Sequence, residues 1–261
     1  MYRELGPDDH LRTLKLERDE LPDVLLLVGV FDVEAGAARF ARYIENAWHL
    51  RTERRGGVPA WLGTYRGLKV ALTAALGGPM AAMHTHMWCA AGVPAVVQLG
   101  WFGALQPGMG LGDVVVPSHA ERQDGVSDWY LPKGILADAT PDLSVAITTS
   151  LRQRDVIVRE GPIFSTPALL AESREIIADW SRHGWFGVDM ETATTFAVAK
   201  SLGVRRAAAL IRIDDLIAEE DSLVEVMERE RLRALRRREQ EVTEAVLDAL
   251  VSERASAGAI A

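Results

Sequence analysis

The stretch QLGWFGALQPGMGLGDVVVP, residues 98–117, decides the fold class because its glycines follow directly on an apolar segment. Residues 94–99 are largely apolar and predict a strand that is buried on both faces. Glycines just beyond such a strand permit tight turns and let a ligand approach the backbone closely. The spacing differs from the G-x-G-x-x-G of a dinucleotide site. The stretch therefore predicts either a ligand-binding strand end or a plain glycine-rich turn between two strands.

Strand patterns and helix patterns alternate on both sides of this stretch. Apolar runs at residues 24–30 and 206–213 predict further buried strands, and a helical pattern covers residues 33–50. Such alternation indicates an α/β layer architecture. We find no linker and no internal repeat, so we expect one domain over residues 1–261 with its core at about residues 24–251.

The composition excludes several classes of partner. The chain has 261 residues, a net charge of -8 and a sequence pI of about 5.3, which argues against nucleic acid, whose phosphates require a basic face. No apolar run approaches the roughly 20 residues that a membrane span needs, so we expect no membrane partner. Cys89 is the single cysteine, which suits a reducing compartment, and we expect a cytoplasmic protein.

The sequence predicts no metal site and no cofactor. His84 and His86 are two residues apart on a predicted helix and would point to different faces of it. A metal shared by the two is therefore not expected, and we interpret them as core or interface histidines.

Two acidic motifs end predicted strands. In GVDMET, residues 187–192, Asp189 is a candidate N-cap, and Glu191 could accept two hydroxyl hydrogen bonds from a sugar diol. In IRIDD, residues 211–215, two adjacent carboxylates could raise one another's pKa and provide a proton donor. An ordinary helix start and a capping turn are the alternative interpretations of the two motifs.

Taken together, the order of these motifs resembles the nucleoside phosphorylase superfamily, which includes purine nucleoside phosphorylases, uridine phosphorylases and methylthioadenosine nucleosidases. The resemblance covers about residues 24–251. The matching features, in chain order, are Val28-Gly29, the hairpin sequence GTYRG (63–67), the turn Gly77-Gly78-Pro79, the glycine-rich run at residues 100–115, Met190-Glu191 and Asp214-Asp215.

The resemblance implies a three-layer αβα sandwich with a mixed, partly barrel-like central sheet. It implies cleavage of the N-glycosidic bond of a nucleoside or nucleoside-like small molecule, with Met190 and Glu191 on the ribose. Asp215 is placed as the acid that protonates the leaving base, since a purine is costly to expel as an anion. Members of the superfamily are oligomers, so a homodimer or a larger homo-oligomer is expected.

The chain departs from the superfamily where the phosphorylases bind phosphate. The turn after the first strand reads GVFDV, residues 29–33, and lacks the arginine of the phosphorylases. Gln98 stands in place of a second arginine, and Trp101 in place of a small hydroxyl residue. Each lost charge-assisted hydrogen bond is worth roughly 1.5–3 kcal/mol. Arg54 or Arg55 falls near a third arginine position, but phosphate as a co-substrate is in doubt.

A hydrolytic reaction is therefore the expectation. Glu34 aligns with the glutamate that activates water in the nucleosidases, and Asp32 is a second candidate for this base. Glu34 could instead be an acidic residue favoured by the dipole of its helix. A phosphorylase with a rebuilt phosphate site remains open, and so does a non-catalytic nucleoside-binding relative or a recruited biosynthetic enzyme.

The base pocket also differs from the pattern of the superfamily. We expect Phe164 or Leu169 at the position where an aromatic ring stacks on the base. Gly100, Trp101 and Phe102 are expected to border the ligand from the glycine-rich run. Burial of both aromatic rings in the core is the alternative.

Overall fold

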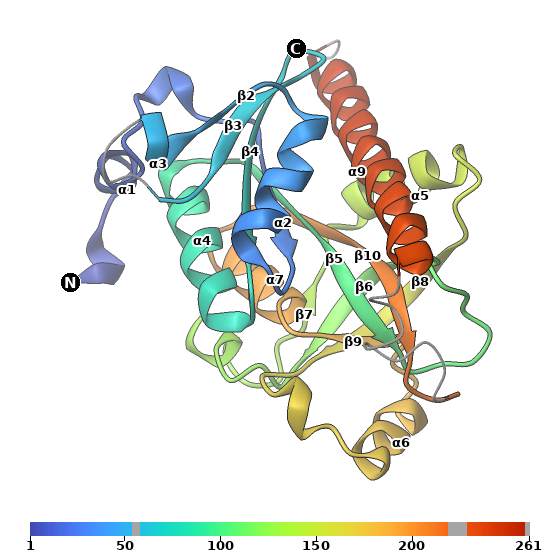
Figure 1. Cartoon of the computed structure of the whole chain (residues 1–261). Helices are drawn as coiled ribbons and strands as arrows, with labels where there is room; N and C mark the ends of the chain where they lie inside the picture. Colours follow the sequence, from blue (N-terminus) through green and yellow to red (C-terminus); the bar gives the residue numbers. More distant parts are fainter. Residues whose placement is uncertain (54–57, 219–228, 259–261) are drawn as a thin grey trace.

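The fold is built on one large mixed sheet (Figure 1). The computed structural model describes residues 1–53, 58–218 and 229–258. The strands are β1 (Val24–Gly29), β2 (Glu45–His49), β3 (Trp61–Tyr65), β4 (Leu68–Ala75), β5 (Ala95–Ala104), β6 (Val114–Arg122), β7 (Ala137–Asp138), β8 (Val158–Ser165), β9 (Gly187–Asp189) and β10 (Arg205–Asp215).

Half of the sheet closes on itself. The strand order is β10-β6-β8-β9-β5-β1-β4-β3-β2, and β10 also pairs with β5. Strands β5, β10, β6, β8 and β9 therefore form a closed ring, while β1 to β4 extend from it as an open sheet. This topology confirms the predicted mixed, partly barrel-like sheet.

Helices cover both faces of the sheet (Figure 1). The helices are α1 (Pro7–Leu14), α2 (Val33–Phe40), α3 (Leu50–Glu53), α4 (Gly78–Ala91), α5 (Pro141–Arg152), α6 (Arg174–Arg182), α7 (Thr192–Ser201) and α9 (Arg229–Gly258). One apolar cluster joins α2, α5 and α9 to the sheet, and two others join α1, α4 and α7 to it. The three predicted layers are thus confirmed. No described helix has the length and apolar character required to cross a membrane.

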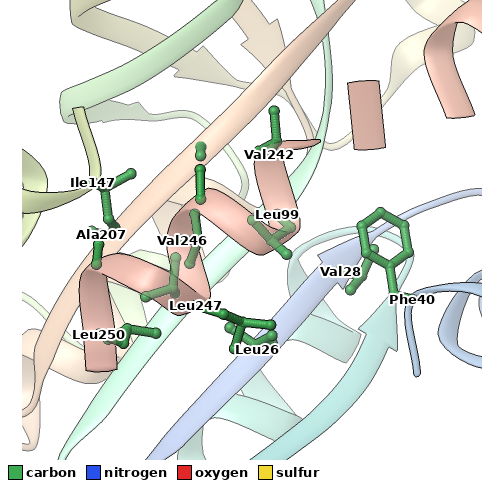
Figure 2. Close-up of a cluster of buried hydrophobic side chains, with 14 of the residues drawn as sticks. Leu26, Val28, Phe40, Leu99, Ile147, Ala207, Val242, Val246, Leu247 and Leu250 are labelled. Carbon is green, nitrogen blue, oxygen red and sulfur yellow. The ribbon is translucent and has the colours of Figure 1, made fainter. Parts of the chain in front are cut away.

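The largest cluster fixes β1 and β5, the two strands that lead to the pocket (Figure 2). Leu26 and Val28 of β1 and Leu99 of β5 are almost fully buried in one cluster with Val246 and Leu247 of α9, and Val28 lies beside Phe40 of α2. Burial of a large aliphatic side chain contributes about 1.5–3 kcal/mol each, so the ends of these strands are held firmly.

The predicted helix over residues 33–50 is too long. Helix α2 ends at Phe40, a 3-10 turn covers Ala41–Tyr43, and β2 then pairs antiparallel with β3. The rings of His49 and Trp61 lie 5.1 Å apart across this pair. The edge of β3 offers backbone partners and cross-strand contacts that outweigh the local helical pattern.

The segment after β8 also differs from its sequence pattern, which is helical over residues 167–180. It begins with a 3-10 turn, η5 (Leu169–Ala171), and α6 starts only at Arg174. The hydroxyl of Ser173 accepts a hydrogen bond from the N–H of Ile176 at 3.3 Å and so caps α6. Residues 166–172 are therefore a loop beside the pocket.

Candidate active site

A pocket lies at the carboxyl ends of β1, β5 and β10, where β9 crosses beside β5. These three strands are parallel neighbours, so their ends meet at one edge of the sheet. The pocket holds about 610 Å³ of space, part of which is open solvent. Its lining includes Gly29, Val30, Phe31, Leu76, Trp101, Phe102, Gly103, Leu169, Val188, Asp189, Met190, Glu191, Ile213, Asp214 and Leu216.

Glu191 is a buried acidic group of the pocket. It is 5% exposed, and its Oε1 accepts a hydrogen bond of 2.6 Å from the backbone N–H of Gly77. A Cβ at Gly29 would lie 2.7 Å from Oε2, so the glycine leaves the room that this carboxyl occupies. Burial, and then the charge of Asp189, raises the pKa of Glu191 to about 8. Glu191 and Met190, which the resemblance places on the ribose, both line the pocket.

Asp189 lies beneath Glu191 and is saturated with hydrogen bonds. Its Oδ1 accepts from the hydroxyl of Ser165 at 2.5 Å. Its Oδ2 accepts from the hydroxyl and the N–H of Thr192, the first residue of α7, at 2.5 and 3.0 Å. Burial raises the pKa of Asp189, and these hydrogen bonds oppose the shift. The sequence predicted Asp189 as the N-cap, but α7 begins at Thr192 with Glu191 in the N-cap position, two residues later. Nothing in the sequence indicated that Asp189 borders a pocket.

Gln98 completes this network rather than lining the pocket. Its Nε2 donates to Oδ2 of Asp189 at 3.1 Å, and the side chain is fully buried. Gly100, two residues further along β5, packs on β1: a Cβ there would lie 3.1 Å from the carbonyl oxygen of Gly29. Both predicted ligand contacts therefore support the floor of the pocket, and neither is part of its lining.

Of the two carboxylates that end β10, Asp214 lines the pocket and Asp215 does not. The Oδ1 of Asp215 accepts hydrogen bonds from the N–H groups of Ile217 and Ala218, and its Oδ2 lies 3.2 Å from Arg212. A bulge in β10 between Arg212 and Asp214 shifts the register against β5 at this point. The catalytic role of Asp215 stays a prediction. In the structure, its carboxyl group stabilises the turn after β10 and forms an ion pair with Arg212.

The two candidates for the water-activating base lie away from the pocket. Asp32 and Glu34 are exposed at the start of α2, and the Oδ1 of Asp32 accepts a hydrogen bond of 3.1 Å from the N–H of Ala35. The residues of this turn that line the pocket are Val30 and Phe31. The interpretation of Glu34 as an ordinary acidic residue of the first helical turn fits this placement.

The residues predicted to border the base divide into two groups. Trp101, Phe102 and Leu169 line the pocket. Phe164 lies outside the lining and packs on Trp180 and Trp185, with ring centroids 4.3 and 4.7 Å away. Of the two residues that the sequence left open for the position beside the base, Leu169 lines the pocket and Phe164 does not.

The described lining carries the carboxyl groups of Asp189, Glu191 and Asp214 and contains neither lysine nor arginine. Arg54 and Arg55, on which a further phosphate contact was expected, lie outside the described residues. Among the residues that the structure places, no group of three His, Cys, Asp or Glu side chains could hold a metal ion.

The α/β fold and the buried glutamate at a strand end fit the superfamily that the sequence resembles. The sequence profile of the phosphorylase superfamily matches residues 26–252, and the chain belongs to this superfamily. The chain is 33% identical over 141 residues to guanosine phosphorylase from Halorubrum lacusprofundi, which covers 53% of this chain and 57% of that protein.

Two further relatives are similar in sequence, and a solved structure has the same fold. A DeoD-type 2 purine nucleoside phosphorylase of Vibrio cholerae is 30% identical over 62% of this chain and 69% of its own length. A uridine phosphorylase of Haemophilus influenzae is 23% identical over 74% and 81%. The crystal structure of uridine phosphorylase from Vibrio fischeri ES114 has a TM-score of 0.77 at 21% identity, covering 90% of this chain and 95% of that one. All of these are named phosphorylases, so the comparisons do not support the expected hydrolytic reaction.

Proposed function

We propose that this protein cleaves the N-glycosidic bond of a nucleoside and transfers the sugar to inorganic phosphate. The observation that carries the proposal is that Met190, Glu191 and Asp214 line a single pocket at the strand ends. Membership of the phosphorylase superfamily and the names of the relatives support phosphate as the acceptor.

Glu191 is the residue that would bind the hydroxyl groups of the sugar. The N–H of Gly77 fixes Oε1, which leaves Oε2 on the side of Gly29. Once ionised, this carboxylate accepts hydrogen bonds from the ribose hydroxyls. Its charge also stabilises the cationic sugar that forms as the bond to the base breaks.

At the base end, Asp214 takes the role of the acid. It lines the pocket and is 9% exposed, whereas the oxygens of Asp215 are occupied by backbone N–H groups and by Arg212. A general acid must reach the atom that it protonates, and of the two only Asp214 borders the space for the base. In this proposal Asp215 shapes the turn that presents Asp214.

A specific observation favours water as a second candidate acceptor. The described lining of the pocket includes Asp189, Glu191 and Asp214 and holds no lysine or arginine. Negative charge on these carboxyl groups repels a phosphate dianion. Transfer to water would release free ribose. The two reactions share the same sugar and base contacts and differ only in the acceptor.

The test is product analysis with purified protein and a panel of adenosine, guanosine, inosine and uridine. With phosphate present, we expect ribose 1-phosphate and free base, and we expect no turnover in phosphate-free buffer. Free ribose formed at the same rate in both buffers would replace phosphorolysis by hydrolysis. Binding without turnover in both would favour the non-catalytic alternative.

Two variants sharpen this test. Glu191→Gln is expected to lower turnover by at least about 100-fold, since it removes the charge at the sugar. Glu34→Gln is the matched glutamate on the exposed start of α2. If the reaction is phosphorolysis, we expect Glu34→Gln to be as active as the unaltered protein. Loss of activity in this variant would instead restore Glu34 as a base for water.

The homo-oligomer and the cytoplasmic location stay predictions. Light scattering on the purified chain measures the first, and a mass of one chain would contradict it. Fractionation of producing cells measures the second.

A further inference from the structure

The first turn of α7 begins directly after Glu191, and two of its side chains bind carboxyl groups of other segments. Thr192 binds Asp189, which belongs to the pocket lining. Thr194 is fully buried, and its hydroxyl donates a 2.7 Å hydrogen bond to Oδ2 of Asp124, which lies outside the lining. The second contact is therefore close to Glu191 in the chain but is not part of the pocket.

Asp124 is a buried carboxyl group in the loop that follows β6. Its Oδ1 accepts hydrogen bonds of 2.8 Å from the N–H groups of Val126 and Ser127, and its Oδ2 accepts from the hydroxyl of Thr194. Donors on both oxygens fix the orientation of the carboxyl group, so the loop offers α7 a well-defined acceptor. Because hydrogen bonds to a charged group are stronger than those between neutral groups, this contact ties the loop firmly to α7.

The turn that orients Glu191 packs directly on this contact. Gly78 begins α4, and a Cβ built there would lie 2.7 Å from Oγ1 of Thr194 and 3.6 Å from the Cβ of Asp124. Only a residue without a side chain therefore fits between the turn and this pair. The preceding residue, Gly77, donates its N–H to Oε1 of Glu191 at 2.6 Å. A shift of the Thr194 hydroxyl thus moves the turn whose N–H orients Glu191.

We propose that the hydrogen bond between Thr194 and Asp124 sets the position of the Gly77-Gly78 turn and thereby holds Glu191 in the orientation that binds the ribose hydroxyls. Thr194 and Asp124 are positioning residues, since both lie outside the pocket lining and act through the turn. This inference rests on the proposed glycosidic cleavage. It does not depend on whether phosphate or water accepts the sugar.

The work proposed for Glu191 explains why such support matters for the rate. A carboxylate that accepts hydrogen bonds from sugar hydroxyls and stabilises a cationic sugar acts only at short range and in one orientation. A displacement of about 1 Å at such a group costs on the order of 100-fold in rate. Loss of the contact behind the turn should therefore reduce turnover through Glu191, and not through the fold as a whole.

The experiment removes the hydroxyl of Thr194 at nearly constant side-chain shape. Thr194→Val is expected to lower kcat/KM on guanosine, or on the nucleoside of the panel that is cleaved fastest, by about 10- to 100-fold. Thr194→Ser, which keeps the hydroxyl, should recover most of this loss. The matched control is Thr243→Val on α9, which removes a buried hydroxyl that donates to the carbonyl oxygen of Glu239 at 2.6 Å. Its kcat/KM per folded molecule should equal that of the unaltered protein.

A double-mutant cycle separates positioning of Glu191 from a general structural effect. In the Glu191→Gln background the group to be positioned is already altered, so Thr194→Val should cost less than about twofold more. A purely structural role would reduce activity by the same factor in both backgrounds. Losses that multiply in this way would overturn the proposal.

Gly78→Ala disturbs the same contact from the side of the turn. The new Cβ would lie 2.7 Å from Oγ1 of Thr194, so the turn and the hydroxyl must move apart. Alanine favours a helix more than glycine does, so α4 itself is not weakened by this change. We expect a loss of kcat/KM similar to that of Thr194→Val, and this variant decides the matter if Thr194→Val does not fold. Full activity of Gly78→Ala would overturn the proposal.

A measurement without turnover separates this inference from the proposed function. The amide proton of Gly77, observed by NMR of the protein labelled with ¹⁵N-glycine, reports its hydrogen bond to Glu191. Its signal should move upfield in Thr194→Val, since the hydrogen bond lengthens, and should stay in place in Thr194→Ser and Thr243→Val. If no nucleoside of the panel is cleaved, the proposed function fails and this signal alone decides the positioning. An amide signal that Thr194→Val leaves unchanged refutes it.

Discussion

The side-chain amide of Gln98 donates a 3.1 Å hydrogen bond to Oδ2 of Asp189, directly beneath the pocket. By resemblance, an arginine that binds phosphate is expected at this position of the chain. Here the position serves a buried carboxylate of the protein itself, and that carboxylate in turn raises the pKa of Glu191. Hydrogen bonds within the chain therefore hold the floor of the pocket.

Gln98→Leu is expected to destabilise the protein by about 1–3 kcal/mol, because a buried carboxylate then loses a hydrogen-bond donor. Urea denaturation measures the change. The matched control is Gln240→Leu, since Gln240 donates to Glu244 on the exposed side of α9. Its effect should stay within about 0.5 kcal/mol. Equal effects of the two substitutions would show that the bond to Asp189 contributes nothing.

Gly29→Ala is expected to abolish activity while leaving most of the stability. The new Cβ would lie 2.7 Å from Oε2 of Glu191, so the carboxyl must turn away from its hydrogen bond with Gly77. A displacement of about 1 Å at a reacting group costs on the order of 100-fold in rate. Nucleoside turnover and thermal unfolding of the same sample measure the two effects.

Gly110→Ala is the control for this substitution. A Cβ at Gly110 meets its nearest atom, Oδ1 of Asp113, at an ordinary 3.7 Å. Its activity should equal that of the unaltered protein. Full activity of Gly29→Ala would mean that the position of Glu191 is not critical for cleavage.

The sequence was sufficient for the elements whose patterns reflect burial on both faces of the sheet. The runs that became β1 and β10 are dictated by packing, and Gly100 by its close approach to Gly29. The strand predicted over residues 94–99 is longer in the structure, since β5 continues through Gly100 to Ala104. Met190 and Glu191 were placed at the site by the resemblance, and they directly follow the short strand β9. The barrel-like closure came from resemblance, since strand patterns alone do not specify which edges pair.

The rest of the site depends on tertiary contacts that leave no local signal. Which of Asp214 and Asp215 enters the pocket is decided by a bulge against β5, and a one-residue shift reverses the face of a side chain. Asp124 lies in a loop, and Thr194, whose hydroxyl it accepts, is 70 positions away in the chain.

Arg39→Ala is expected to destabilise the protein by about 3–5 kcal/mol, because it leaves the carboxylate of Glu239 buried without its partner. The guanidinium of Arg39 on α2 donates two hydrogen bonds, of 2.8 and 3.0 Å, to Glu239 on α9, whose side chain is fully buried. Arg66→Ala, which removes an exposed ion pair with Asp248, should cost at most about 1 kcal/mol. Equal unfolding free energies of the two variants would contradict a special role for the buried pair.

Glu191 gives the protein a characteristic dependence of stability on pH. Its pKa in the folded chain, about 8, lies above the usual value of 4.5, so between these values the folded state binds a proton that the unfolded state has released. Glu191 therefore lowers the free energy of unfolding as the pH rises from about 5 to about 8, by at most about 1.4 kcal/mol per unit.

Glu191→Gln removes this titration, and we expect the decline of stability between pH 5 and pH 8 to become shallower. It should not vanish, since Asp189 has a raised pKa as well and contributes with the same sign. Urea denaturation at half-unit pH intervals measures the slope, with Glu34→Gln as the exposed glutamate for comparison. An unchanged slope in Glu191→Gln, or an equal change in both variants, would mean that Glu191 is ionised in the folded protein at neutral pH. The carboxylate would then be ready for the ribose hydroxyls before substrate arrives, whereas a shallower slope means that binding must include loss of its proton.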